Sequence, residues 1–200
     1  MAKTQDERSA GTRRAINDAT IRSLVEKGYS ATTTSEVCAR AGVSRGALTH
    51  HFASKQEMMI SAVAHLSEAS ERRMSASSRT LPDGPDRTRA VIEMLWDSFT
   101  SDLFYASLEL WNAARTDPVL QEALYSAEHR LGERHRILVA ELFGEPLAVQ
   151  PGFARAVEML FRQLRGAAVT RILSRRPDAE TQVVDDVVLM FTAISEPATA

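Results

Sequence analysis

Cysteine and long apolar runs are almost absent from this sequence. Cys38 is the only cysteine in 200 residues, so no disulfide can form within the chain. A zinc site built from several cysteine ligands is excluded for the same reason. The longest uncharged stretches, such as residues 187–195, are far shorter than the ~20 residues that cross a bilayer. Because the N-terminus is charged and lacks the apolar segment of a signal peptide, we expect a cytoplasmic protein with no membrane partner.

Motifs that carry catalysis are also missing. The sequence has no glycine-rich phosphate loop, no Cys/His cluster with the spacing of metal ligands and no nucleophile motif. His129 and Glu133 lie four residues apart and could begin a metal site, but the sequence indicates no third ligand. These absences count against an enzyme, and we expect neither a cofactor nor a metal.

The charge that is present is unevenly distributed, although the net charge is only −2. Residues 1–56 hold nine Lys and Arg against five Asp and Glu, so the rest of the chain is acidic. A basic N-terminal segment followed by an acidic remainder indicates that only the N-terminal segment binds a polyanion. The apolar content of 44% is enough for one large core or two small ones.

Helical periodicity runs through the whole chain, and no alternating strand pattern appears. Caps, prolines and glycines set the limits of the helices. We expect about nine helices, which cover residues 8–27, two short segments within 33–52, and then about 55–74, 86–100, 102–115, 118–143, 153–174 and 178–196. The sequence therefore predicts an all-α fold.

The most informative region runs from Thr32 to Phe52, where two short helices are joined by a tight turn. Thr33 can cap the first helix, and Glu36 stands at the position that completes a capping box. Gly42 supplies the left-handed residue that ends this helix.

The second short helix of this region is capped by Ser44. Leu48 gives it a buried side together with Phe52, which leaves Arg45, Thr49 and His50 outward. Such an arrangement is a helix-turn-helix whose second helix can lie in the major groove of DNA.

The string T-T-T-S-E-V-C-A-R-A-G-V-S-R-G-A-L-T-H-H-F-A-S-K, from Thr32 to Lys55, resembles the DNA-binding domain of the TetR/AcrR family. The resemblance covers roughly the first 60 residues, whereas the rest is similar only in length and helical layout. It implies a three-helix DNA-binding domain over residues 1–56 and a helical ligand-binding and dimerisation domain over residues 57–200. Members are generally homodimeric regulators, mostly repressors, that a small molecule releases from DNA.

The resemblance also implies a set of DNA contacts. Bases or nearby phosphates would be contacted by Arg45, Gly46, Thr49 and His50, and phosphates by Thr33, Ser44, His51 and Lys55. Arg45 is the best candidate for specificity, because a guanidinium can bridge O6 and N7 of guanine. Thr49 departs from the family, which usually has Tyr there; the Thr methyl group could instead touch a thymine, or the site could simply be weaker.

Aromatic side chains gather in the middle of the chain and could line an apolar pocket for a small-molecule effector. The pocket residues that we predict are Trp96, Phe99, Phe104, Leu108, Trp111 and Tyr125. The alternative is that these residues, at helical spacing, form ordinary core.

The last two helices carry apolar stripes, and the family resemblance makes them the expected dimer interface. The predicted interface residues are Leu160, Leu164, Ala168, Ile172, Val184, Val188 and Phe191. Alternatively, the stripes pack within one subunit.

The leading hypothesis is a homodimeric repressor that binds a pseudo-palindromic double-stranded operator and is released by an apolar or amphipathic small molecule. An activator, or a DNA binder that needs no ligand, is the first alternative. An all-α enzyme with an incidental helix-turn-helix is the alternative of a different class.

Overall fold

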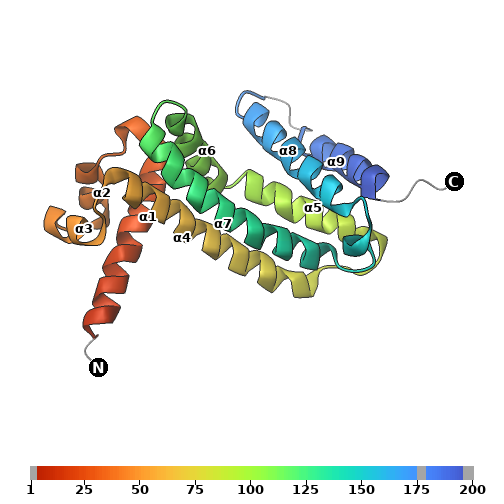
Figure 1. Ribbon diagram of the computed structural model, residues 1–200, viewed down its shortest axis with the longest axis horizontal. Coiled ribbons are helices and arrows are strands. Elements are labelled where there is room, and N and C mark those ends of the chain that lie inside the picture. Colours follow the sequence, from red (N-terminus) through yellow and green to blue (C-terminus); the bar gives the residue numbers. More distant parts are fainter. Residues whose placement is uncertain (1–3, 175–178, 196–200) are drawn as a thin grey trace. The chain divides into compact units, whose positions relative to one another are not determined.

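The structure is a computed structural model that describes residues 4–174 and 179–195. Every regular element in those residues is a helix (Figure 1). The α-helices are α1 (Gln5–Ala31), α2 (Thr34–Ala41), α3 (Arg45–His51), α4 (Lys55–Ser77), α5 (Pro85–Phe99), α6 (Asp102–Ala114), α7 (Pro118–Phe143), α8 (Phe153–Arg171) and α9 (Ala179–Ser195). Two short 3₁₀ helices, η1 (Ser78–Thr80) and η2 (Leu147–Val149), lie between them. The predicted all-α class is confirmed over the described chain.

The chain packs as two compact units. The first contains Met1–Ser70 with Asp102–Gly132, and the second contains Glu71–Ser101 with Glu133–Ala200. Helix α6 therefore packs in the same unit as the three N-terminal helices. The predicted domain division after residue 56 concerns function and stays a prediction.

Helix α1 is the centre of the first unit and packs against α2, α3 and α6 (Figure 1). Its apolar face is fully buried at Ile16 and Leu24. Helix α6 contributes Ala106 and Leu110 to the same core. Burying one such aliphatic side chain stabilises the fold by about 1.5–3 kcal/mol, so this core holds α2 and α3 together with α1 and α6.

The second unit is built around α8 and α9, which pack along each other and both contact α5. Three phenylalanine rings close this core. Phe143 stacks on Phe191 with ring centroids 4.5 Å apart, and Phe153 meets both rings edge-on. Gly152 lets α9 approach closely, because a Cβ there would lie 2.2 Å from the carbonyl oxygen of Ile194.

Burial divides the residues of the predicted dimer interface, all of which lie in this unit. The buried members of the predicted set are Leu160, Leu164, Ala168, Val184 and Phe191. Their own chain covers these five side chains, and the interface stays a prediction. Only Ile172 and Val188 of that set remain accessible to solvent.

Over the residues that the structure describes, none of the helices combines the length and the apolar character needed to span a membrane.

Candidate nucleic-acid interface

Two hydroxyl groups fix the ends of the helix-turn-helix. The Thr33 hydroxyl accepts a hydrogen bond from the Glu36 backbone N–H at 3.2 Å, and the Ser44 hydroxyl accepts one from the Ala47 N–H at 3.1 Å. Gly42 adopts the left-handed conformation (φ 67°) that ends α2. The caps and the turn predicted from the sequence are therefore confirmed, and both hydroxyls are already engaged in the fold.

One face of helix α3 is buried in the core, and the opposite face is exposed to solvent. Leu48 is 1% exposed and packs in the core of the first unit, next to Phe52 at the end of the helix. The side that faces away carries the predicted base-contacting residues Arg45, Gly46, Thr49 and His50, all of which are exposed. A short helix with one fixed face and one exposed polar face has the geometry that major-groove recognition requires.

The Thr49 hydroxyl is engaged inside its own helix. It lies 3.2 Å from the Arg45 carbonyl oxygen and 3.1 Å from the Gly46 carbonyl oxygen and donates to this pair. The hydroxyl is thus not free for a phosphate in this conformation. Contact between the Thr49 methyl group and a thymine stays a prediction.

His51 lies at the end of α3 and is half-buried, unlike its exposed neighbour His50. The two rings meet edge-on, with centroids 5.4 Å apart. Burial lowers the pKa of His51 below its ordinary value of 6.5, and the charges of His50 and Arg13 lower this pKa further. The His51 ring is therefore neutral at pH 7.5 in the free protein. A DNA phosphate close to the ring would favour its charged form.

Lys55 has an internal partner that the sequence did not indicate. Its ammonium nitrogen donates to the carbonyl oxygen of Tyr29 at 2.9 Å and lies 4.4 Å from the centroid of the Tyr29 ring. Burial lowers the pKa of Lys55. The predicted phosphate contact is untested, but Lys55 first ties the start of α4 to the end of α1.

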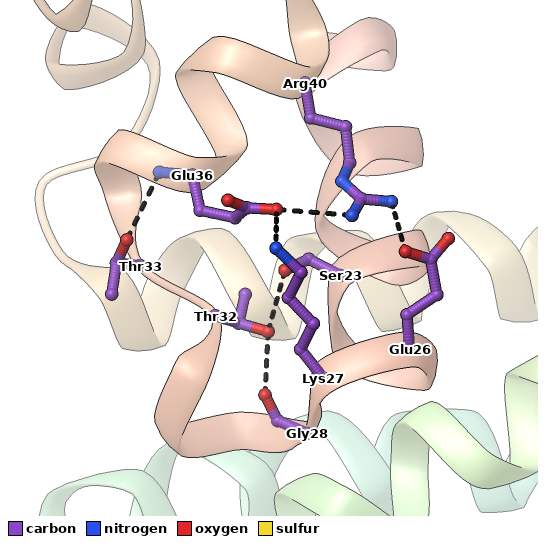
Figure 2. Close-up of polar contacts among 8 residues, drawn as sticks. All are labelled: Ser23, Glu26, Lys27, Gly28, Thr32, Thr33, Glu36 and Arg40. Carbon is purple, nitrogen blue, oxygen red and sulfur yellow. Dashed lines mark hydrogen bonds and ion pairs between the residues drawn. The ribbon is translucent and has the colours of Figure 1, made fainter.

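A network of charges joins α1 to α2 (Figure 2). A Glu36 carboxylate oxygen lies 2.6 Å from Nζ of Lys27 and 3.2 Å from Arg40, and Arg40 also pairs with Glu26 at 2.7 Å. The hydrogen bonds from Lys27 and then from Arg40 lower the pKa of Glu36. Glu36 uses its side chain in this network, so the expected capping box is made only by the Thr33 half.

The spacing of Glu36 and Arg40 could have revealed part of this network, because oppositely charged residues four apart on a helix face each other. The contacts of Glu36 with Lys27 and of Arg40 with Glu26 depend instead on how α1 and α2 pack. Sequence reasoning had no means to find them.

The Thr32 side chain reinforces the same junction. Thr32 is completely buried, and its hydroxyl hydrogen-bonds with the Gly28 carbonyl oxygen at 2.8 Å and with the Ser23 hydroxyl at 3.1 Å (Figure 2). Thr32 directly precedes the cap of α2. The end of α1 therefore fixes where the helix-turn-helix begins.

The residues predicted to line an effector pocket are divided between the two units. Trp96 and Phe99 belong to the second unit, and Phe104, Leu108, Trp111 and Tyr125 belong to the first. Phe104 is buried and Trp111 half-buried, whereas Tyr125 is 69% exposed and stacks on His129. The pocket stays a prediction, and Tyr125 lies on the surface of α7.

The helix-turn-helix lies within the part of the chain that matches a known protein family. Residues 16–62 match the family described as "Bacterial regulatory proteins, tetR family". The HTH-type transcriptional regulator CymR of Pseudomonas putida is 33% identical over 172 residues, which span 84% of this chain and 82% of CymR. The chain belongs to the TetR family. This TetR-family member is accordingly a DNA-binding transcriptional regulator with a helix-turn-helix near its N-terminus.

Solved structures extend the TetR fold over nearly the whole chain. A TetR transcription regulator from Haloarcula marismortui superposes with a TM-score of 0.69 at 17% identity, covering 92% of this chain and 98% of that one. FadR from Bacillus subtilis, in complex with stearoyl-CoA, has a TM-score of 0.68 at 16% identity, with coverage of 88% and 96%. At these identities the likeness establishes the fold alone.

Proposed function

We propose that this TetR-family protein is a homodimeric repressor. It binds a pseudo-palindromic operator through α3 and leaves the DNA when an apolar or amphipathic small molecule binds. The observation that carries the proposal is the exposed face of α3, where Arg45, Thr49 and His50 project from a helix whose opposite face is locked in the core.

Arg45 carries sequence recognition in this proposal. It stands at the first position of α3 and is exposed to solvent. A guanidinium in the major groove binds O6 and N7 of guanine together, which is worth about 1–3 kcal/mol against another base. Phosphate contacts from Thr33, Ser44, His51 and Lys55 position the helix and carry no sequence information.

A second copy would pair with this chain through α8 and α9. Apolar side chains that the chain leaves exposed there are Val169 (39%), Ile172 (56%), Leu173 (89%) and Leu189 (73%). Large apolar side chains that a chain leaves exposed can mark a protein interface. Two-fold pairing sets the recognition helices one helical turn apart, about 34–36 Å, or a multiple of it.

The effector is the least constrained part of the proposal. Phe104, Leu108 and Trp111 on α6 supply apolar contact area, and the Trp111 indole N–H already donates to Glu128 at 2.9 Å. Bacillus subtilis FadR, which shares the fold, was solved with stearoyl-CoA. These points support an apolar or amphipathic ligand for this chain.

The test is fluorescence anisotropy of the purified protein on the DNA upstream of its own gene, with a scrambled duplex as control, at two salt concentrations. Selective binding to the upstream DNA is expected. Equal and steeply salt-sensitive binding to both duplexes would contradict an operator in that DNA and indicate nonspecific phosphate binding. A reporter placed behind the same DNA should rise when the gene is deleted, and a fall would instead identify an activator.

A further inference from the structure

The end of α1 is a corner formed by Gly28 and Tyr29, and side chains from two other helices hold it. The Tyr29 backbone N–H donates to Oε2 of Glu109 on α6 at 2.9 Å. The Tyr29 carbonyl oxygen accepts from Nζ of Lys55, the first residue of α4, also at 2.9 Å. Both backbone groups of one residue are therefore fixed by charged side chains that lie far away in the sequence.

Gly28 makes the approach of Glu109 possible. Its φ is +74°, a conformation that L side chains rarely adopt. A Cβ at this position would also lie only 2.9 Å from Oε2 of Glu109. The glycine thus serves the turn and leaves room for the carboxylate that holds the next N–H.

The corner leads directly into the DNA-binding helices. The Gly28 carbonyl oxygen accepts from the buried Thr32 hydroxyl, and Thr33 then caps α2. Helix α2 packs against α3, which carries Arg45. A displacement at Tyr29 is consequently a displacement at the start of the helix-turn-helix.

Glu109 shares its helix with residues proposed to meet the effector. Helix α6 is 13 residues long and carries Phe104, Leu108 and Trp111 along with Glu109. Glu109 therefore links this helix to the end of α1 through its hydrogen bond with Tyr29.

We propose that Glu109 is a positioning residue for DNA binding: its carboxylate holds the Gly28–Tyr29 corner in the conformation that presents α3. This inference rests on the proposed function, because it names the contact through which α6 supports the DNA-binding helices. Glu109 itself touches no DNA.

The experiment compares four single variants with the wild-type protein. Glu109→Ala removes the acceptor, Glu109→Gln keeps an oxygen acceptor without the charge, and Glu109→Asp keeps the charge on a shorter side chain. Glu122→Ala is the matched control: Glu122 is an exposed acid on α7 in the same unit, and its side chain makes no hydrogen bond or ion pair with another described residue. The readouts are amide hydrogen exchange at Tyr29 and through residues 33–51, thermal melting, and affinity for a duplex selected from random DNA with the wild-type protein.

Glu109→Ala and Glu109→Asp should speed exchange at Tyr29 and in residues 33–51 and weaken DNA binding about tenfold, the lower range for a hydrogen bond to a charged group. Glu109→Gln should stay within about threefold of the wild type, because its amide oxygen accepts the same N–H. Glu122→Ala should match the wild type in every readout.

Two results overturn the inference. One is wild-type exchange and affinity in Glu109→Ala; the other is a loss in Glu109→Gln as large as in Glu109→Ala, which would mean that charge rather than the hydrogen bond matters. If the wild-type protein selects no duplex, the proposed function fails. The exchange data then still decide whether Glu109 holds the corner.

Discussion

The ammonium nitrogen of Lys55 lies 2.9 Å from the carbonyl oxygen of Tyr29 and 4.4 Å from the centroid of its ring. This contact joins the start of α4 to the end of α1 within the first unit. An ammonium has three donors, so Lys55 can keep Tyr29 and still bind a phosphate. One side chain then serves both the fold and the proposed DNA contact.

Lys55→Ala should therefore destabilise the free protein as well as weaken DNA binding. We expect the free energy of unfolding to fall by about 1–3 kcal/mol, because the Tyr29 carbonyl loses a charged partner. Urea unfolding without DNA measures this loss, with the exposed Arg22→Ala as a control. An unchanged unfolding midpoint would contradict the structural role. Binding should weaken equally for all sequences, with a salt slope reduced by about 1.

Arg45→Ala should relax sequence preference and leave the fold intact. The side chain is exposed, so the urea midpoint should stay at the wild-type value. We expect a loss of about 1–3 kcal/mol on the selected duplex, because the bidentate contact to guanine disappears. Anisotropy on that duplex and on single-base-pair variants tests this. If the variant retains both affinity and preference, another residue reads the operator.

DNA affinity should rise as the pH falls from 7.5 to 5.5, and His51 should account for part of the rise. The pKa of His51 in the free protein lies below 6.5, so the ring is neutral at the upper end of this range. A phosphate nearby raises the pKa in the complex, so protons are taken up on binding. Each unit of difference between the two pKa values gives up to about a tenfold gain in affinity.

The control for this pH dependence is a pair of histidine variants. His51→Gln should flatten the affinity profile, whereas His50→Gln should keep the part that belongs to His51. The prediction fails if His51→Gln titrates as steeply as the wild-type protein.

The Glu36 network should stabilise the protein at neutral pH and lose its effect in acid. Hydrogen bonds from Lys27 and Arg40 lower the pKa of Glu36 below its ordinary value of 4.5. A carboxylate with a lowered folded pKa stabilises the fold above the unfolded value, and the effect is lost as the pH falls through the folded pKa. Glu36→Gln should thus be less stable than the wild type at pH 7, and the two should converge below pH 4.5.

Urea unfolding at pH 7 and at about pH 3.5 measures the convergence predicted for Glu36 from linkage. Glu122→Gln, an exposed acid in the same unit, serves as the control and should follow the wild type at both pH values. If the two proteins differ by the same free energy of unfolding at both pH values, the ionised carboxylate of Glu36 is not the source of the stabilisation.

The exposed apolar surface of α9 gives a direct test of dimerisation. Leu189→Asp should convert the dimer to a monomer at micromolar concentration, because it would bury a charge in the proposed interface. Light scattering after size exclusion gives the mass. Val149→Asp, at another exposed apolar residue, should remain dimeric. If the Leu189→Asp protein stays dimeric, the interface does not include Leu189. If the wild-type protein is a monomer, the proposed dimer is wrong.

The helix-turn-helix follows from local sequence, because the interactions that define it act over three or four residues. Thr33 and Ser44 each cap an N–H three positions ahead, and Gly42 ends α2 through its own backbone conformation. The spacing of Leu48 and Phe52 settled which face of α3 is buried. Exposure of Arg45, Thr49 and His50 followed from that periodicity alone.

Contacts between side chains that are distant in the sequence depend on how the helices pack. The apolar spacing of α8 and α9 indicated a buried stripe but could not tell the subunit's own core from a dimer face, and five of the seven predicted interface residues belong to the core. Lys55 appeared free for a phosphate until packing placed it on Tyr29. Glu109 and Tyr29 are 80 residues apart, and their contact depends on how α6 packs against α1, which no local pattern encodes.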